Sequence, residues 1–251
     1  MHRGAPIWEH QAAMAKHSPD RCTICKTRST GLICGLSRRV RDRVEQDRAT
    51  HVFRRGQSIF YAGTPAHALY VLRSGRVKVF RTWRGGEEQV LRLLGPGELL
   101  GYRPLLADEP YVASAEAVED STLCIIPAAT VRELLRDVPG LAFELLAKLA
   151  RELRLSEDLM MDLIHRPVRQ RAARLLLLLF ADNQGSSEPA LLRSHQLRRQ
   201  DMARMIGTTP ETFSRVLRGF AQRGIVALSR DRIRIRDHAL LHKVAGESAA
   251  E

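Results

Sequence analysis

The hydrophobic positions divide the chain into a strand-rich part and a helical part. Between residues 51 and 127, short runs of Val, Leu, Ile, Phe and Tyr alternate with glycine-bearing turns. Runs of strand length at such regular intervals are typical of an antiparallel β-sandwich or roll. Residues 69–80 predict two strands around a turn at Ser74-Gly75, where glycine tolerates a positive φ.

After Pro127 the periodicity becomes helical. Pro139 suits the first turn of a helix that we expect to continue to His165, before Arg166-Pro167 interrupts it. Its apolar positions approach the 3.5-residue spacing of a coiled coil, with Ser156 in register: Ala142, Leu146, Leu149, Leu153, Met160 and Leu163. This face either packs on the chain's own β-roll or pairs with a second copy. We favour pairing because more leucines are available for a second contact, namely Leu141, Leu145, Leu155 and Leu159.

A further helix is expected over residues 168–181, and a helix-turn-helix pattern follows at residues 199–220. Its first helix ends at Ile206, and Gly207 suits the left-handed turn. Thr209 is a good N-cap, Pro210 fits the first helical position, and Glu211 favours the positive end of the helix dipole. These residues predict a second helix that begins at Pro210.

The second helix divides its side chains between two faces. Its apolar face contains Phe213, Val216, Leu217 and Phe220, and its polar face contains Glu211, Thr212, Ser214, Arg215 and Arg218. A DNA-recognition helix has this arrangement, because one side anchors it while the other enters the major groove. Arg215 can donate twice to guanine, and Glu211 can accept from cytosine N4. Thr209 and Arg199 complete the candidate DNA contacts; the alternative is an ordinary solvated surface helix.

Positive charge is concentrated in the same region. Residues 166–237 contain fifteen Arg, no Lys and six acidic residues, a local net charge of +9 within a total of +12. Two strands expected at 225–228 and 232–236 would form a wing that carries alternating arginines. The charge is either a solubilising surface or a site for a polyanion such as DNA phosphate.

Three of the four cysteines lie close together near the start of the chain. Cys22, Cys25 and Cys34 fall within thirteen residues, and Cys124 is remote from them. The sequence shows no secretory leader and no apolar run long enough for a membrane span, so we expect a cytoplasmic protein. Structural disulfides are disfavoured in a reducing cytosol, so the trio indicates a metal or redox role. We expect no enzyme, because the chain lacks a phosphate loop, an HExxH motif and a nucleophile elbow.

The whole layout resembles the CRP/FNR family of bacterial transcription regulators. The resemblance extends from about residue 20 to 240 and rests on the β-roll glycines, the long helix and residues 209–215. It implies an α+β chain with an N-terminal antiparallel β-roll of the cyclic-nucleotide-binding jelly-roll type and a C-terminal winged helix-turn-helix. We expect a flexible arm at 1–20, a Cys-bearing segment and sensor roll at 21–138, a dimerisation helix at 139–165 and a DNA-binding domain at 166–251.

The resemblance also implies partners and a target. In the FNR branch a Glu-x-x-Ser-Arg arrangement contacts TTGAT half-sites, and Glu211, Ser214 and Arg215 match it in order and spacing. It therefore implies a homodimer on a TTGAT-N4-ATCAA-like inverted repeat of double-stranded DNA, with RNA polymerase as a further partner and no membrane.

For the sensor, the resemblance points away from cyclic AMP and toward iron and sulfur. Cyclic-nucleotide-binding members use a Gly-Glu pair, present as Gly97-Glu98, followed by an Arg-Ser pair that residues 110–115 lack. Cys22, Cys25, Cys34 and Cys124 resemble the ligands of a 4Fe–4S cluster in the FNR branch. Zinc, a dithiol redox pair, or no cofactor remain alternatives, as does a metal-binding scaffold that regulates nothing. We expect that loss of the cluster in oxygen weakens pairing of the dimerisation helix and DNA binding.

Overall fold

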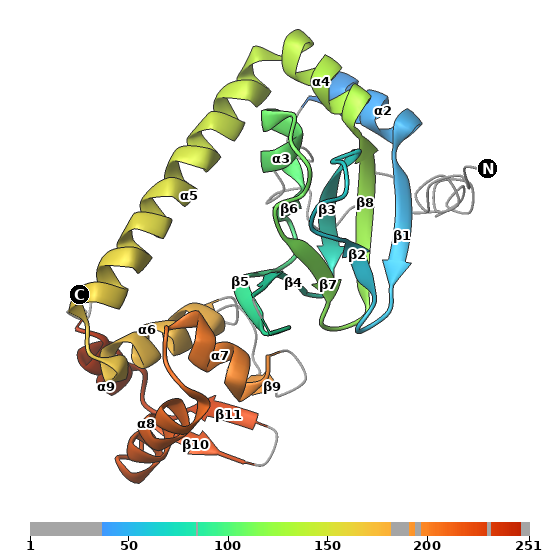
Figure 1. Ribbon diagram of the computed structural model, residues 1–251. Helices are drawn as coiled ribbons and strands as arrows, with labels where there is room; N and C mark the ends of the chain where they lie inside the picture. Colours follow the sequence, from blue (N-terminus) through green and yellow to red (C-terminus); the bar gives the residue numbers. More distant parts are fainter. Residues whose placement is uncertain (1–36, 84, 182–190, 194–196, 230–231, 247–251) are drawn as a thin grey trace. The chain divides into compact units, whose positions relative to one another are not determined.

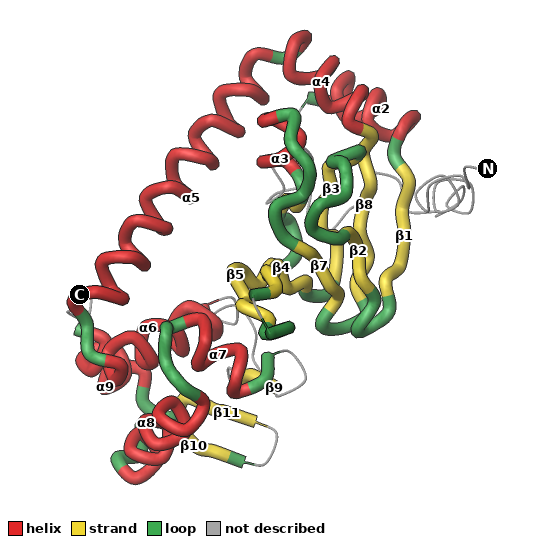
Figure 2. Tube along the Cα trace, viewed as in Figure 1, coloured by secondary structure: helices red, strands yellow, loops and turns green. Residues whose placement is uncertain are grey.

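The computed structural model describes residues 37–83, 85–181, 191–193, 197–229 and 232–246. The chain divides into two compact units, one built on residues up to 149 and the other on residues 150–251, to which the segment 82–91 also belongs. Figure 1 labels the elements, and Figure 2 separates the strands from the helices by colour. Among the described helices, none combines the length and apolarity needed to cross a membrane.

Two four-stranded sheets form a β-roll, which belongs to the first unit except for residues 82–91. One sheet has the order β1 (Ala49–Phe53), β8 (Ser121–Pro127), β3 (Ala68–Ser74) and β6 (Leu99–Leu100). The other has the order β2 (Ser58–Phe60), β7 (Ser114–Ala117), β4 (Val77–Thr82) and β5 (Glu88–Leu94). Five of the strand pairs, β1–β8, β8–β3, β3–β6, β2–β7 and β7–β4, are antiparallel, as expected from the alternation of apolar runs and turns.

The turn at Ser74-Gly75 lies where the sequence places it, but its flanking strands do not pair with each other. β3 and β4 belong to opposite sheets, so the chain crosses between the layers at this turn. Gly75 has φ of 90°, and an added Cβ would lie 2.3 Å from the Ser121 Oγ and 2.6 Å from the Asp120 carbonyl oxygen. Only glycine fits this close crossing. A pattern of two apolar runs around a turn does not show whether the two strands pair with each other or cross from one sheet to the other.

Two hydrophobic clusters hold the first unit together. The inter-sheet cluster lies between the sheets and includes Phe53, Leu72, Val77, Leu94, Ala115 and Leu123. The helix-covered cluster lies on the other side of the first sheet and includes Val40, Val44, Leu69, Val71, Cys124, Ile126 and Leu134. Because side chains alternate along a strand, Leu123 faces the first cluster and Cys124 the second.

Four helices accompany the roll: α2 (Arg38–Asp47), α3 (Tyr102–Ala107), α4 (Ala128–Asp137) and α5 (Pro139–His165). α2 and α4 lie side by side against the first sheet (Figure 1), and Arg43 of α2 forms ion pairs with Glu133 and Asp137 of α4. In α5, Leu141 and Leu145 are buried in the helix-covered cluster. These two leucines therefore pack on the chain's own roll.

The second unit is a winged helix-turn-helix. It contains α6 (Val168–Ala181), α7 (Arg199–Met205), α8 (Pro210–Gln222) and α9 (His238–Ala245), with a sheet in the order β10 (Val226–Leu228), β11 (Arg232–Ile235) and β9 (Leu191–Arg193). The wing thus has a third strand, β9, that the sequence did not predict, because only three residues form it after a polar stretch. The expected α+β class, with an N-terminal roll, a long helix and a C-terminal helix-turn-helix, is confirmed.

Candidate nucleic-acid interface and the Cys124 site

The turn between α7 and α8 depends on Gly207. This glycine has φ of 62°, and its backbone lies so close to α5 that an added Cβ would be 2.9 Å from the Leu163 Cδ2. The α7 helix ends one residue earlier than Ile206, which is its C-cap. The sharp turn brings the start of α8 out beside α7, as the glycine in the sequence predicted.

The start of α8 is fixed by local capping. The Thr209 Oγ1 accepts a hydrogen bond of 3.3 Å from the Thr212 backbone N–H, and Pro210 occupies the first helical position. Along the helix, Phe213, Leu217 and Phe220 are buried and anchor it to the second unit. Val216, expected on the same face, is only partly buried because it lies at the edge of that stripe.

The polar face of α8 is open. Glu211, Arg215 and Arg218 are exposed, and their spacing of four and three residues places them on one side of the helix. Thr212 and Ser214 are partly exposed beside them. An exposed acid followed by exposed arginines along one side of a helix can hydrogen-bond to base edges.

The carboxylate of Glu211 is held at the N-terminus of its own helix. Its pKa is lowered below the ordinary value, first by a hydrogen bond from its own backbone N–H and then by one from the Thr209 side chain. Desolvation opposes the charge but is weaker than either hydrogen bond, so the pKa stays below its ordinary value. Glu211 is therefore an ionised acceptor at neutral pH, as contact with a cytosine amino group requires.

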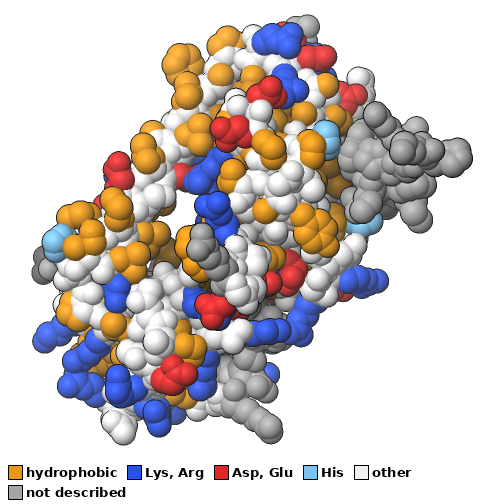
Figure 3. Space-filling view, viewed as in Figure 1, with side chains coloured by type: hydrophobic (Ala, Val, Ile, Leu, Met, Phe, Trp, Pro, Cys, Tyr) orange, Lys and Arg blue, Asp and Glu red, His pale blue; other side chains and the backbone are white. Residues whose placement is uncertain are grey.

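Arg199 and the wing extend the basic surface. Arg199 is exposed at the first position of α7, and its Nη2 donates to the Ser229 carbonyl oxygen at 3.4 Å. In β11, Arg232 and Arg234 face outward while Ile233 and Ile235 are buried. Figure 3 shows Lys and Arg side chains gathered over the part of the view where α6, α8 and α9 lie.

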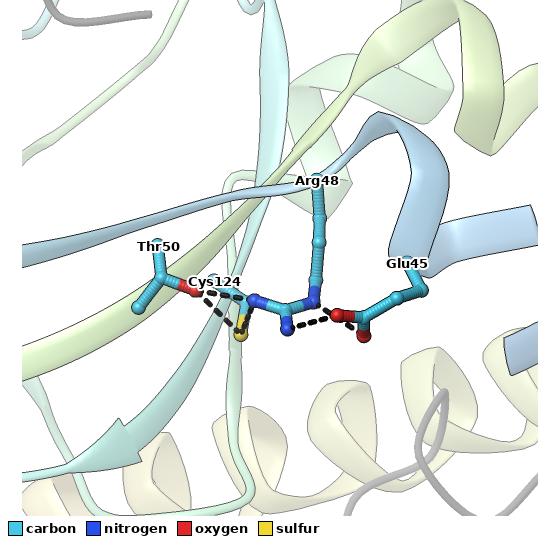
Figure 4. A network of polar contacts seen from close by, with 4 residues as sticks. All are labelled: Glu45, Arg48, Thr50 and Cys124. Atoms are coloured by element: carbon cyan, nitrogen blue, oxygen red, sulfur yellow. Dashed lines mark hydrogen bonds and ion pairs between the residues drawn. The ribbon is translucent and has the colours of Figure 1, made fainter. Parts of the chain in front are cut away.

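The described part of the proposed sensor site centres on Cys124. Its thiol is buried in β8, between Thr50 of β1 and Val71 of β3. The Arg48 guanidinium lies between this sulfur, at 3.8 Å, and the Glu45 carboxylate, at 2.7 Å (Figure 4). The Thr50 hydroxyl contacts both the guanidinium and the sulfur. The sequence did not single out Arg48 or Thr50, because the contact joins residues more than seventy positions apart.

Cys22, Cys25 and Cys34 lie outside the described residues. In the part of the chain that the structure describes, no group of three or more His, Cys, Asp or Glu side chains could hold a metal ion. The environment of Cys124 nevertheless suits an anionic sulfur, because a guanidinium can donate to it and Thr50 lies beside it. Cys124 thus fits the role of one ligand among four.

Glu98 and Tyr111, which lie in the two segments compared above with cyclic-nucleotide-binding members, have partners within the roll. The Glu98 carboxylate accepts a hydrogen bond of 2.6 Å from the Gly95 N–H and is 3.8 Å from Arg92. Tyr111 stacks on Phe60 at 4.0 Å between ring centroids, and its hydroxyl donates to the Ala68 carbonyl oxygen. Burial raises the pKa of Tyr111, so its hydroxyl stays neutral.

A β-roll joined by a long helix to a winged helix-turn-helix with an open, basic recognition surface defines a class: DNA-binding regulators with a separate sensor domain. The comparisons with known proteins agree with this class. Residues 50–138 match the cyclic nucleotide-binding domain, and residues 170–244 match the Crp-like helix-turn-helix domain. The chain belongs to the CRP/FNR family of transcription regulators.

Relatives from both branches of the family are similar to this chain. The cyclic AMP receptor protein of Thermus thermophilus is 40% identical over 207 residues, which are 80% of this chain and 92% of the relative. The transcriptional activator protein anr of Pseudomonas aeruginosa is 30% identical over 193 residues, 77% of this chain and 79% of the relative. The structure of FixK2 from Bradyrhizobium japonicum shares the fold, with a TM-score of 0.70 at 24% identity over 81% of this chain and 99% of that one.

Proposed function

We propose that this regulator binds a TTGAT-N4-ATCAA-like inverted repeat as a homodimer and that a 4Fe–4S cluster controls its activity. The observation that carries the DNA target is the open polar face of α8, where Glu211, Ser214 and Arg215 stand in the order and spacing of the FNR-branch pattern. RNA polymerase is the proposed protein partner, as the family resemblance implies.

Each candidate side chain has a role in this proposal. Arg215 donates to the O6 and N7 atoms of a guanine, and Glu211 accepts from cytosine N4. Ser214 and Thr212 contact a base or a phosphate, while Arg218 contacts the backbone. Thr209 orients Glu211, and Arg199 approaches phosphate from the side of the wing.

The exposed face of α5 supports the homodimer. Leu146, Leu153 and Met160, spaced seven residues apart, are each more than half exposed, and Leu155 and Leu159 are exposed as well. Leu155 and Leu159 lie on another side of the helix, so the pairing face is the exposed apolar line formed by Leu146, Leu153 and Met160, which is unfavourable in water and marks an interaction site. Pairing two copies of α5 about a two-fold axis buries this face and presents two recognition helices about 34 Å apart. Leu141 and Leu145 take no part, because they pack on the roll.

The sensor proposal assigns Cys22, Cys25, Cys34 and Cys124 as ligands. α2 begins four residues after Cys34, and its Val40 shares the helix-covered cluster with Cys124. Four residues extend at most about 14 Å, which limits how far the Cys34 thiol can lie from the start of α2. When bound, a cluster of this kind supplies an oxygen-sensitive link between distant cysteines. The link would tie residues 21–36 to the roll near the start of the dimer helix.

Cyclic AMP is not the proposed ligand, although a relative carries that name. The Glu98 carboxylate already closes the turn at Gly95, and residues 110–115 contain no cationic side chain that could pair with a cyclic phosphate. Addition of cyclic AMP should leave DNA affinity unchanged in a fluorescence anisotropy titration. A large increase in affinity would overturn this point and leave the DNA target intact.

The domain division is part of the proposal: an arm at 1–20, a sensor domain at 21–138, a dimerisation helix at 139–165 and a DNA-binding domain at 166–251. The test begins with anaerobic purification and counts of iron and sulfide per chain. A brown protein with about four irons supports the cluster, and a colourless protein with zinc refutes it. Salt-sensitive binding to the inverted repeat but not to a scrambled duplex supports the DNA target.

A further inference from the structure

The junction between α5 and α6 contains an ion cluster centred on Asp162. Its Oδ1 accepts from the Arg166 Nε at 2.5 Å, and its Oδ2 accepts from the Arg174 Nε at 2.8 Å. Arg166 belongs to the two-residue link between the helices, and Arg174 to α6. The Asp162 side chain is only 16% exposed, so water screens these pairs less than it screens surface pairs. One carboxylate therefore joins α5, the link and α6.

Two more contacts surround the same turn of α5. The Arg171 Nη1 of α6 donates to the Leu163 carbonyl oxygen at 3.1 Å. The Arg166 Nη1 donates to the Ala245 carbonyl oxygen, at the end of α9, at 3.3 Å. Arginines are favoured here because the last carbonyls of α5 are partly negative and lack partners within the helix. The last turn of α5 is thus connected to both α6 and α9.

The junction also contacts the helix-turn-helix directly. The Leu163 side chain, next to Asp162, covers Gly207 so closely that a Cβ there would be 2.9 Å away. Gly207 is the turn that sets α8 against α7. A change in the direction of the last turn of α5 therefore displaces Leu163, which contacts the turn between α7 and α8.

We propose that Asp162 is a positioning residue that fixes the angle between α5 and the DNA-binding unit, and with it the spacing of the two recognition helices. This inference rests on the proposed homodimer and its inverted repeat. Asp162 touches no DNA in this proposal. It determines whether the second recognition helix meets its half-site when the first is bound. This linked second contact is the reason why a dimer binds the inverted repeat more tightly than a monomer binds one half-site.

The test measures binding of full-length protein to fluorescent duplexes that differ only in spacing. They carry two half-sites separated by spacers of about two to six base pairs, or one half-site beside a scrambled one. Wild-type protein should favour one spacer. The Asp162→Asn variant should lose at least about tenfold in affinity for that spacer, or about 1.4 kcal/mol, and flatten the spacing profile. Its affinity for the single half-site should change less than about twofold.

The change in net charge caused by Asp162→Asn opposes the expected loss of DNA affinity, so the charge change cannot itself produce that loss. Asp162→Asn makes the protein more basic and should strengthen contact with phosphate in general. Asp42→Asn is the matched control, because Asp42 forms an exposed i,i+4 pair with Arg38 in α2, far along the chain from the junction. The double variant Asp162→Asn/Arg174→Gln should lose little more than the single variant, since both changes break the same contact.

If Asp162→Asn weakens binding equally on all duplexes, or weakens it on none, Asp162 has no positioning role. A melting temperature close to that of wild type excludes unfolding as the cause of a selective loss. Failure of the proposed function has a different signature, because wild-type protein would then favour no spacer at all.

Discussion

Arg215 provides the sharpest test of the DNA-binding surface. Arg215→Ala removes the guanidinium from an exposed position on α8, beside the buried stripe formed by Phe213, Leu217 and Phe220. Because the side chain is exposed and alanine favours helices, we expect the free energy of unfolding to change by less than about 0.5 kcal/mol. Any large change in DNA affinity then comes from the lost contact.

The expected loss of DNA affinity in Arg215→Ala follows from the two-fold symmetry of the proposed complex. A bidentate arginine–guanine pair contributes about 1–3 kcal/mol of discrimination. Two half-sites double this to about 2–6 kcal/mol, which corresponds to a loss of about 30-fold to about 20,000-fold in affinity. On a duplex with one half-site, the loss should be half as large in free energy.

The assay is fluorescence anisotropy at fixed salt, with Arg223→Ala as the control. Arg223 is the exposed C-cap of the same helix, so the control removes an equal charge from the opposite end. Replacing the single G·C pair of each half-site should weaken wild-type binding by at least about 1–3 kcal/mol per half-site, and should weaken Arg215→Ala binding less, because only the Glu211 contact with the cytosine of that pair remains to be lost. If Arg215→Ala discriminates at that base pair as strongly as wild type, or loses no more affinity than Arg223→Ala, the assignment of Arg215 is wrong.

Three further predictions concern the dimer, the sensor and the helix start. Leu153→Asp places a charge in the apolar face of α5 and should convert the dimer to a monomer by light scattering; an unchanged mass would contradict pairing through this face. Cys124→Ser should lose iron and visible absorbance while the chain stays folded, whereas a variant that keeps about four irons would exclude Cys124 as a ligand. Thr209→Ala removes the N-cap and should lower the free energy of unfolding by about 1 kcal/mol in urea titrations. It should also raise the pKa of Glu211 toward its ordinary value in NMR titrations, because Thr209 is one of the two groups that lower it. Because that pKa is lowered in the folded chain, ionised Glu211 stabilises the fold above its ordinary pKa, and this stabilisation is lost as the pH falls through the lowered value.

Most of the recognition helix was predictable from its sequence because its determinants are local. The N-cap Thr209, the proline after it and the stripe of buried aromatic and leucine residues all act within one or two turns. The same holds for Gly207, whose positive φ follows from the turn it makes. Val216 is the exception on this helix, because its burial depends on neighbours in other elements.

The sequence alone determined the change from a strand-rich to a helical part, the ends of α5 and the two faces of α8, since neighbouring residues specify these through backbone preferences and periodicity. Only the tertiary structure decided that β3 and β4 lie in opposite sheets, that Leu141 and Leu145 pack on the roll, and that Arg48 lies beside Cys124. These features join residues distant in the chain. Such contacts depend on how whole elements pack, and no pattern within a short stretch of sequence contains that information.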